Sequence, residues 1–243
     1  MMKKMEQQQE QVGVVFIHGA GLNRGIWTEV ATGFEYPSLF IDFPIREVED
    51  ASHNTLALAD YVRHIRQQID AWGVSKIVLV AHSLGGIPAL QVADALADRL
   101  AGFVAVGAAI PRKGGSFLSV LPFPKRILMS IILRKLGTKP PESAIRSGLC
   151  NDLSEEQASQ VIKNFTPESI RVYTDSIDVT PPPVPKLYVQ LSKDKEFGSA
   201  MQQKMIANLK AEYVRTLDSG HLPMLSDPKG LRHVLNQFLT EAI

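Results

Sequence analysis

The sequence predicts a single α/β domain with about six mostly parallel strands, flanking helices, and a helical cap inserted within the domain. Short Val/Ile-rich runs alternate with helical patterns, which is typical of βα units whose parallel sheet is buried on both faces. The alternation stops once, over residues 111–185. The length of 243 residues and the hydrophobic fraction of 45% suit one such domain with a sizeable core.

The strands and helices are predicted from short runs of regular periodicity bounded by turn residues. The expected strands, in order along the chain, are residues 12–17, 38–41, 76–81, 103–107, 186–191 and 212–216. The expected helices between and after them are residues 55–72, 86–97, 201–209 and 229–241.

The insertion at 111–185 is punctuated by prolines and is mostly helical in pattern. Residues 154–157 form a Ser-Glu-Glu-Gln capping box, which predicts a helix from there to about Phe165. Pro167 is expected to start another helix at its first turn. Residues 181–183 are three prolines, which force an extended return to the fifth strand. An insertion of this size is typical of a lid or cap over a site.

Composition excludes several classes of protein. The net charge of +1 gives no electrostatic reason to expect nucleic acid as a partner. Cys150 is the sole cysteine, which excludes an intrachain disulfide and fits a reducing compartment. Lys3 and Lys4 precede no signal-peptide pattern, and residues 6–11 are expected to be a frayed polar lead-in. No apolar run has the length of a membrane span, so a soluble cytoplasmic protein is expected.

Ser83 is the strongest candidate for chemistry. The apolar run 76–81 leads into Ala81-His82-Ser83-Leu84-Gly85 and then directly into a helical pattern. A small-x-Ser-x-Gly turn between a strand and a helix strains the serine backbone and projects its hydroxyl from the sheet edge. The five-residue pattern alone is weak, but its position between strand and helix makes it specific.

Other polar residues follow the ends of the predicted strands, where ligands of open parallel sheets bind. His18-Gly19-Ala20-Gly21 follows the first strand and Asp42 the second, while Asp194 follows the fifth and His221 the last. The chain order Ser83, Asp194, His221 is the order of the catalytic triad in α/β hydrolases.

These residues resemble the α/β-hydrolase superfamily over nearly the whole chain, and within it the group of plant methylesterases and hydroxynitrile lyases. The resemblance rests on five stretches: the His-Gly-Ala-Gly turn at 18–21, Ala-His-Ser-Leu-Gly-Gly at 81–86, Leu-Ser-Lys-Asp at 191–194, Gly-His-Leu-Pro-Met-Leu at 220–225 with Asp227-Pro228, and, less specifically, 151–156.

The chemistry required at such a site assigns a role to each group. A serine hydroxyl is a poor nucleophile at neutral pH, so His221 would take its proton and return it to the leaving alcohol. Asp194 would hold the imidazole tautomer and stabilise the imidazolium. The resemblance implies an oxyanion hole made by the backbone N–H groups of Leu84 and Ala20. No metal or organic cofactor is required.

Several residues have a second interpretation. Asp175 and Asp178 precede the fifth strand and are alternatives to Asp194 as the partner of the histidine. His18 and His82 are expected to be structural, since each flanks a motif whose backbone, and not the histidine side chain, has the functional role. Asp42 is expected to accept hydrogen bonds from loop N–H groups, and Cys150 to be an inert residue of the cap.

Two positions separate hydrolases from lyases in the group that the chain resembles. Hydroxynitrile lyases of this type carry Thr directly after the opening His and Lys directly after the catalytic His, where the Lys stabilises cyanide. This chain has Gly19 and Leu222 at those positions. The resemblance therefore implies hydrolysis in preference to lyase activity.

The first part of the insertion is basic and apolar. Between 111 and 141 there are seven basic residues and no acidic one: Arg112, Lys113, Lys125, Arg126, Arg134, Lys135 and Lys139. The favoured interpretation is a solvated helix whose basic residues flank a face packed on the site. The alternative is contact with an anionic lipid surface or guidance of acidic substrates.

The sequence thus predicts a serine esterase that cleaves carboxylic esters of small or medium apolar compounds through an acyl-Ser83 intermediate. A ligand sensor of the same fold with slow turnover is one alternative. A cofactor-free lyase or perhydrolase that uses the same triad is another. Acyl and alcohol preferences depend on packing across the insertion, and the oligomeric state leaves no signal in the sequence.

Overall fold

The computed structural model describes residues 12–44 and 55–243. Its six strands form one sheet in the order β2-β1-β3-β4-β5-β6, and every neighbouring pair is parallel, as predicted. The strands are β1 (Val12–Ile17), β2 (Ser38–Ile41), β3 (Lys76–His82), β4 (Leu100–Val106), β5 (Lys186–Leu191) and β6 (Tyr213–Leu217). The predicted lead-in at 6–11, with Lys3 and Lys4, lies outside the described residues.

The strand predictions differ from the structure mainly at β4. This strand begins at Leu100, three residues earlier than predicted, because Leu100 pairs with Ile77 of β3. It ends at Val106 because Gly107 turns the chain at a φ of 47°. The predicted first residue of the last strand, Glu212, lies outside β6, and its carboxylate instead binds the backbone and ammonium groups of Lys186.

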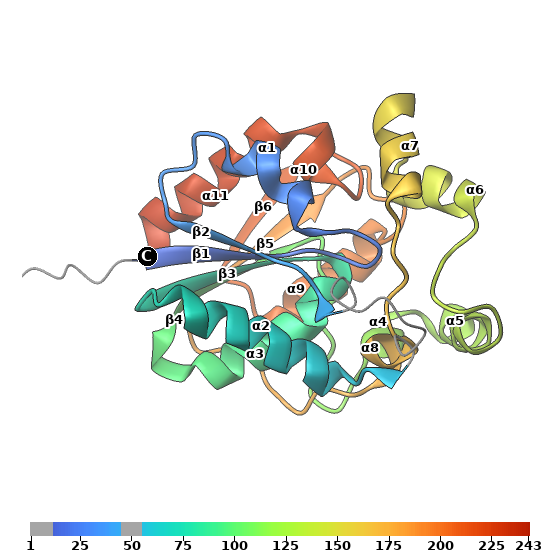
Figure 1. Cartoon of the computed structure of the whole chain (residues 1–243), viewed down its shortest axis with the longest axis horizontal. Helices are drawn as coiled ribbons and strands as arrows, with labels where there is room; N and C mark the ends of the chain where they lie inside the picture. The colour runs from blue at the N-terminus through green and yellow to red at the C-terminus, as the bar shows by residue number, and fades with distance from the viewer. Residues whose placement is uncertain (1–11, 45–54) are drawn as a thin grey trace, which may run out of the picture.

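Helices cover both faces of the sheet (Figure 1). One face carries α2 (Leu58–Trp72), α3 (Gly86–Leu96) and α9 (Ser199–Leu209), whose apolar side chains form one core cluster with the sheet. The other face carries α1 (Thr28–Ala31), α10 (Pro223–Ser226) and α11 (Pro228–Ala242), which form the second cluster. Burial of apolar area on both faces is the main stabilising contribution to such a sheet.

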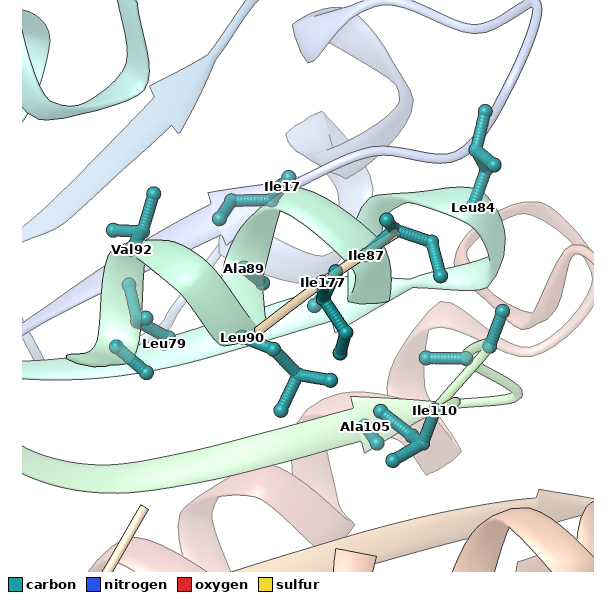
Figure 2. Packing of buried hydrophobic residues seen from close by; sticks show 14 of the residues in the cluster. Ile17, Leu79, Leu84, Ile87, Ala89, Leu90, Val92, Ala105, Ile110 and Ile177 are labelled. Carbon is teal, nitrogen blue, oxygen red and sulfur yellow. The ribbon is translucent and has the colours of Figure 1, made fainter. Parts of the chain in front are cut away.

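The helix α3 follows the Ser83 turn directly and is buried along most of its length. Figure 2 shows Ile87 and Leu90 of α3 above Ala105 of β4 and beside Ile110 and Ile177. The helix ends one residue before the predicted boundary, because Ala97 takes a φ of 46° that no α-helix continues. Because α3 is packed on the sheet, it fixes the orientation of the Ser83 turn that precedes it.

Two predicted helix starts are wrong by three residues, while α9 (Ser199–Leu209) and α11 (Pro228–Ala242) begin two residues and one residue earlier than predicted. The helix predicted from residue 55 begins at Leu58, after an N-terminal turn in which Asp60 and Asp175 accept the N–H groups of Ala57 and Leu58. Pro167 starts no helix; α8 (Ile170–Thr174) begins three residues later, because the Ser169 hydroxyl caps its first turn.

The insertion between β4 and β5 lies beyond the carboxyl ends of the strands (Figure 1). Its other helices are α4 (Phe117–Val120), α5 (Phe123–Leu136), α6 (Glu142–Ala144), the π-helical turn η6 (Ile145–Leu149) and α7 (Glu155–Lys163). The predicted capping box at Ser154 and Gln157 is confirmed, although α7 ends at Lys163.

Buried hydrogen bonds attach the insertion to α2. The Tyr61 hydroxyl of α2 donates to the Glu168 carboxylate and accepts the N–H of Ser169. The Thr138 hydroxyl donates to the Glu168 carbonyl. These groups are buried away from water, so breaking one bond leaves a buried polar atom without a partner.

Across 12–44 and 55–243 no helix is both long and apolar enough to cross a membrane.

Candidate active site

Ser83 lies at a sharp turn between β3 and α3. Its backbone φ is 51°, the left-handed region that a non-glycine residue adopts only at a cost. The turn passes so close to the end of β1 that a Cβ at Gly85 would collide with the His18 carbonyl. Glycine at 85 is therefore a steric requirement of this turn.

Ser83, His221 and Asp194 form one chain of hydrogen bonds. The Ser83 Oγ is 2.8 Å from His221 Nε2, and His221 Nδ1 is 2.8 Å from Asp194 Oδ2. All three residues are buried, so little water competes for these bonds. With Nδ1–H donating to the carboxylate, Nε2 turns its lone pair toward the serine hydroxyl.

The loop after β5 holds Asp194 firmly in place. The other carboxylate oxygen, Oδ1, accepts the backbone N–H groups of Glu196 and Phe197 at 2.8 and 2.9 Å. The buried Gln202 side chain of α9 bonds the N–H and carbonyl of Leu191 and the carbonyl of Phe197. The carboxylate is therefore oriented before any substrate arrives.

Two buried histidines at the site have opposite pKa shifts. Burial alone would lower the pKa of His221, but the Asp194 carboxylate with its hydrogen bond, together with the charges of Glu196 and Asp152, outweighs burial and raises the pKa above its ordinary value. Burial and the nearby His221 hold the pKa of His82 well below its ordinary value. The His82 Nε2–H donates to the His221 carbonyl, so the neutral His82 supports the backbone of the site.

The insertion contacts both loops that carry the acid and the base. The Asn151 side chain donates to the Lys193 carbonyl, next to Asp194. The Asp152 carboxylate accepts the N–H of Gly220, next to His221. The sequence singled out 151–156 only by resemblance. The structure adds that two of these side chains bridge the loops after β5 and β6.

The structure does not bring the alternative carboxylates to His221. Asp175 accepts the N–H of Leu58 at the start of α2, and Asp178 lies at the surface beside Lys113. Asp42 accepts the N–H of Arg24, as the sequence suggested for a loop carboxylate. Cys150 is buried, and burial raises the pKa of its thiol to about 11.

His18 is buried beside the Phe43 ring, with the ring centroids 4.2 Å apart, and its Nδ1 lies 2.8 Å from the Gly19 carbonyl. A Cβ at Gly19 would lie 2.8 Å from the Cβ of Ser83 and from His82 Nδ1. The turn at 18–21 therefore runs against the back of the serine. Ala20 and Leu84 both line the pocket in front of it.

The pocket at Ser83 has a volume of about 240 Å³ and mostly apolar walls. The sequence missed these walls because nothing in a periodic pattern shows which residues of the insertion turn inward. Besides the predicted residues, the lining includes Phe117, Met129, Leu133, Leu149, Phe165, Tyr173 and Phe197.

Glu196 is a charged side chain of the pocket that the sequence analysis did not single out. Desolvation by the surrounding walls raises the pKa of this carboxyl, Asp194 adds to the rise, and His221 and Lys125 oppose it. Glu196 is partly open to solvent and lines the pocket, so its carboxyl is a polar group in otherwise mostly apolar walls. Among the residues that the structure describes, no cluster of three His, Cys, Asp or Glu side chains is arranged to hold a metal ion.

Comparison with known proteins identifies the family of the chain. Residues 14–234 match the model of the Alpha/beta hydrolase family, so the chain belongs to that family. Methylesterase 9 of Arabidopsis thaliana is 25% identical over 195 residues, which are 72% of this chain and 75% of that protein. Pheophorbidase of Raphanus sativus is 24% identical over 241 residues, 90% of this chain and 91% of that protein. The predicted resemblance to the methylesterase-like group is confirmed.

A solved structure supports the fold. An extracellular α/β-hydrolase from a Paenibacillus species, described as a structural and functional homologue of tobacco salicylic acid binding protein 2, superposes with a TM-score of 0.83. It is 19% identical and covers 93% of this chain and 98% of its own. At that identity the likeness concerns the fold alone.

Proposed function

We propose that this chain is a serine esterase that cleaves carboxylic esters of small or medium apolar compounds through an acyl-Ser83 intermediate. Carboxylic ester hydrolysis is the reaction class of the methylesterase relative. The observation that carries the serine mechanism is the hydrogen-bond chain from Ser83 through His221 to Asp194, at the wall of an apolar pocket.

Acylation begins with the Ser83 hydroxyl. His221 Nε2 removes its proton as Oγ attacks the ester carbonyl carbon, and the carbonyl π electrons move onto oxygen to give a tetrahedral oxyanion. Asp194 stabilises the imidazolium that forms. When the intermediate collapses, the bond to the alkoxy oxygen breaks, and His221 returns its proton to the departing alcohol.

The oxyanion is assigned to the backbone N–H groups of Leu84 and Ala20. Leu84 lies in the first turn of the helical segment after β3, η4 (Ser83–Gly85), where amide groups lack an intrahelical acceptor. Ala20 lies in the turn against the other side of the serine. Donors fixed in place before the reaction stabilise the developing charge without reorganisation.

Deacylation repeats these steps with water. His221 takes a proton from water, the hydroxide attacks the acyl carbon, and the Ser83 oxygen leaves with the proton that His221 returns. The free acid is the second product, and the triad is restored. His221 mediates each proton transfer, from Ser83 to the leaving alcohol in acylation and from water to Ser83 in deacylation.

The pocket limits the substrate. About 240 Å³ with aromatic and aliphatic walls suits an apolar acyl or alcohol part smaller than a drug-sized ligand. Leu222 is fully buried and contributes no cation, so the site lacks the group that would stabilise a cyanide leaving group. This favours hydrolysis over the lyase alternative.

The first prediction concerns the nucleophile. Ser83→Ala should reduce kcat on a short-chain nitrophenyl ester by about 10⁴-fold or more, because triad residues act as a unit. The far-UV spectrum and melting temperature should stay close to wild type. A fluorophosphonate probe should label one peptide, the one containing Ser83.

Ser192→Ala is the matched control, since Ser192 is an exposed serine near the site that bonds Asp218. It should keep activity and labelling. Wild-type activity in Ser83→Ala, or labelling elsewhere, contradicts the proposal. Labelling of Ser83 with a single slow turnover, together with a large stabilisation by ligand, would favour the ligand sensor instead.

A further inference from the structure

The helix α5 carries most of the exposed large apolar side chains among the residues that the structure describes. Seven large apolar side chains are exposed within 12–44 and 55–243, and five of them lie on α5. They are Phe123 at 74%, Ile127 at 48%, Leu128 at 59%, Ile131 at 48% and Leu136 at 76% exposure. Contiguous exposed apolar surface on a soluble fold marks an interaction site.

The two sides of α5 have different environments. Leu133 is buried, and with Met129 it lines the pocket at Ser83. Ile127, Leu128 and Ile131 lie about half a turn away from that pair, on the side that faces solvent. The sequence favoured a helix with one apolar face packed on the site. In the structure only part of the apolar residues of α5 pack in this way.

Basic side chains surround this exposed face. Lys125, Arg126, Arg134 and Lys135 of α5 are exposed, and none of them forms a salt bridge within the described part of the chain. The surrounding sequence, 111–141, contains no acidic residue. A stretch with several basic side chains and no carboxylate attracts an anionic partner.

A groove beside α5 is lined by both basic and aliphatic residues. It has a volume of about 470 Å³, and the residues that line it include Arg126 and Arg134 together with Ile127 and Ile131. Arginine presents a planar fork of donors that suits phosphate oxygens. An anionic head group in this groove would sit directly beside aliphatic side chains.

We propose that α5 docks the protein on the surface of an anionic phospholipid bilayer. Ile127, Leu128 and Ile131 enter the boundary between head groups and acyl chains, and Arg126, Arg134 and Lys135 contact the phosphates. Basic residues flanking an apolar helical face are the signature of helices that lie in this boundary. The helix has 14 residues and lies on the bilayer without crossing it.

The charge pattern argues against a second copy of the chain as the occupant. Two copies joined through α5 would place basic faces against each other without a carboxylate from either 111–141 segment. The position of α5 at the outer edge of the insertion also leaves it open to a flat surface (Figure 1).

Docking through α5 has a consequence for the substrate, which rests on the proposed function. Met129 and Leu133 line the pocket from the same helix, so a docked α5 places the pocket next to the bilayer. Apolar esters dissolved in the membrane are then the substrate class with the most direct access to the pocket.

The test is co-sedimentation of the full chain with vesicles. The wild type should bind vesicles of phosphatidylcholine with phosphatidylserine, and bind phosphatidylcholine alone much more weakly. Binding should fall when salt rises from 0.1 to 1 M, because salt screens surface charge. Arg134→Gln with Lys135→Gln should lower the partition coefficient by about 30-fold. Ile127→Ser with Ile131→Ser should lower it by about tenfold or more.

Lys163→Gln with Lys229→Gln is the control, because it removes the same charge from exposed sites away from α5. It should bind vesicles like the wild type, and all variants should hydrolyse a soluble ester at the wild-type rate without vesicles. Equal binding to anionic and neutral vesicles, equal loss in the control, or dimerisation through α5 overturns the docking proposal. Vesicle binding without esterase activity would refute the proposed function and leave docking intact.

Discussion

In the proposed mechanism the imidazole of His221 transfers protons between a hydroxyl and a leaving group, so its pKa would set the pH range of activity. Burial is the largest single influence on this ring and opposes its protonation, but the carboxylates of Asp194 at 2.8 Å, Glu196 and Asp152 together outweigh burial. The balance raises the pKa above the ordinary value of about 6.5. His221 acts as a base only when neutral, so activity is lost as the pH falls through this raised pKa.

A pH profile tests this balance. The acid limb of kcat/KM for a short-chain ester should have its midpoint above pH 6.5 in the wild type. Asp194→Asn should reduce kcat by about 10⁴-fold and move the remaining acid limb to lower pH, because it removes the charge that raises the pKa of His221. Asp178→Asn, on an exposed carboxylate far from the imidazole, is the control and should change neither quantity. An acid limb of Asp194→Asn at the wild-type pH would refute the assignment of Asp194.

At the scale of elements, the site is built where three loops meet. The loops after β5 and β6 carry Asp194 and His221, and the insertion joins them through Asn151 and Asp152. The end of a strand fixes where a loop begins, but it does not fix the position of a side chain on that loop to within hydrogen-bond distance. The contacts from the insertion supply that restraint.

Asp152→Asn tests whether the insertion positions the base. Loss of the charge-assisted bond from the Gly220 N–H should lower kcat by about tenfold with little change in KM. Asp152 also contributes to the raised pKa of His221, so the acid limb should move slightly to lower pH. A purely structural role would not move the limb.

Glu156→Gln removes one exposed carboxylate from the same segment and should leave kcat and the pH profile unchanged. If Asp152→Asn and Glu156→Gln behave alike, the contact to Gly220 has no positioning role. Thermal melting of both variants separates a loss of fold from a loss of rate.

At the scale of the whole molecule, the buried histidines His82 and His221 give stability opposite dependences on pH. The pKa of His82 is lowered in the folded protein. Below about pH 6.5 this ring is therefore protonated in the unfolded chain but not in the folded protein, and stability decreases as the pH decreases. The folded pKa of His221 is raised, so its stabilising contribution is complete below about pH 6.5 and is lost as pH rises through the folded pKa. Their combined contribution is greatest near pH 6.5.

Urea unfolding between pH 5 and 6.5 measures the His82 contribution. The free energy of unfolding of the wild type should fall on acidification, with about 1 kcal/mol per pH unit arising from this ring. His82→Gln should lack that part of the slope. The exposed His233→Gln should keep it. Parallel slopes for the wild type and His82→Gln would mean that His82 is protonated in the fold.

The sequence by itself determined the parallel sheet, the position of each strand to within three residues, and the turn that exposes Ser83. These features depend on local periods of burial and on local turn chemistry, which neighbouring residues encode. Element ends were less certain, because side chains from distant segments, such as Asp175 at the start of α2, decide which amides are satisfied.

Only the tertiary structure decided which carboxylate meets His221 and which face of α5 remains exposed. Asp194 and Asp175 are both acidic residues near the fifth strand, but only the packed loop after β5 brings a carboxylate to the imidazole. The pocket walls and the exposed side of α5 likewise follow from how the insertion packs on the sheet. Contacts between residues far apart in the chain depend on the packing of whole elements, which no local pattern contains.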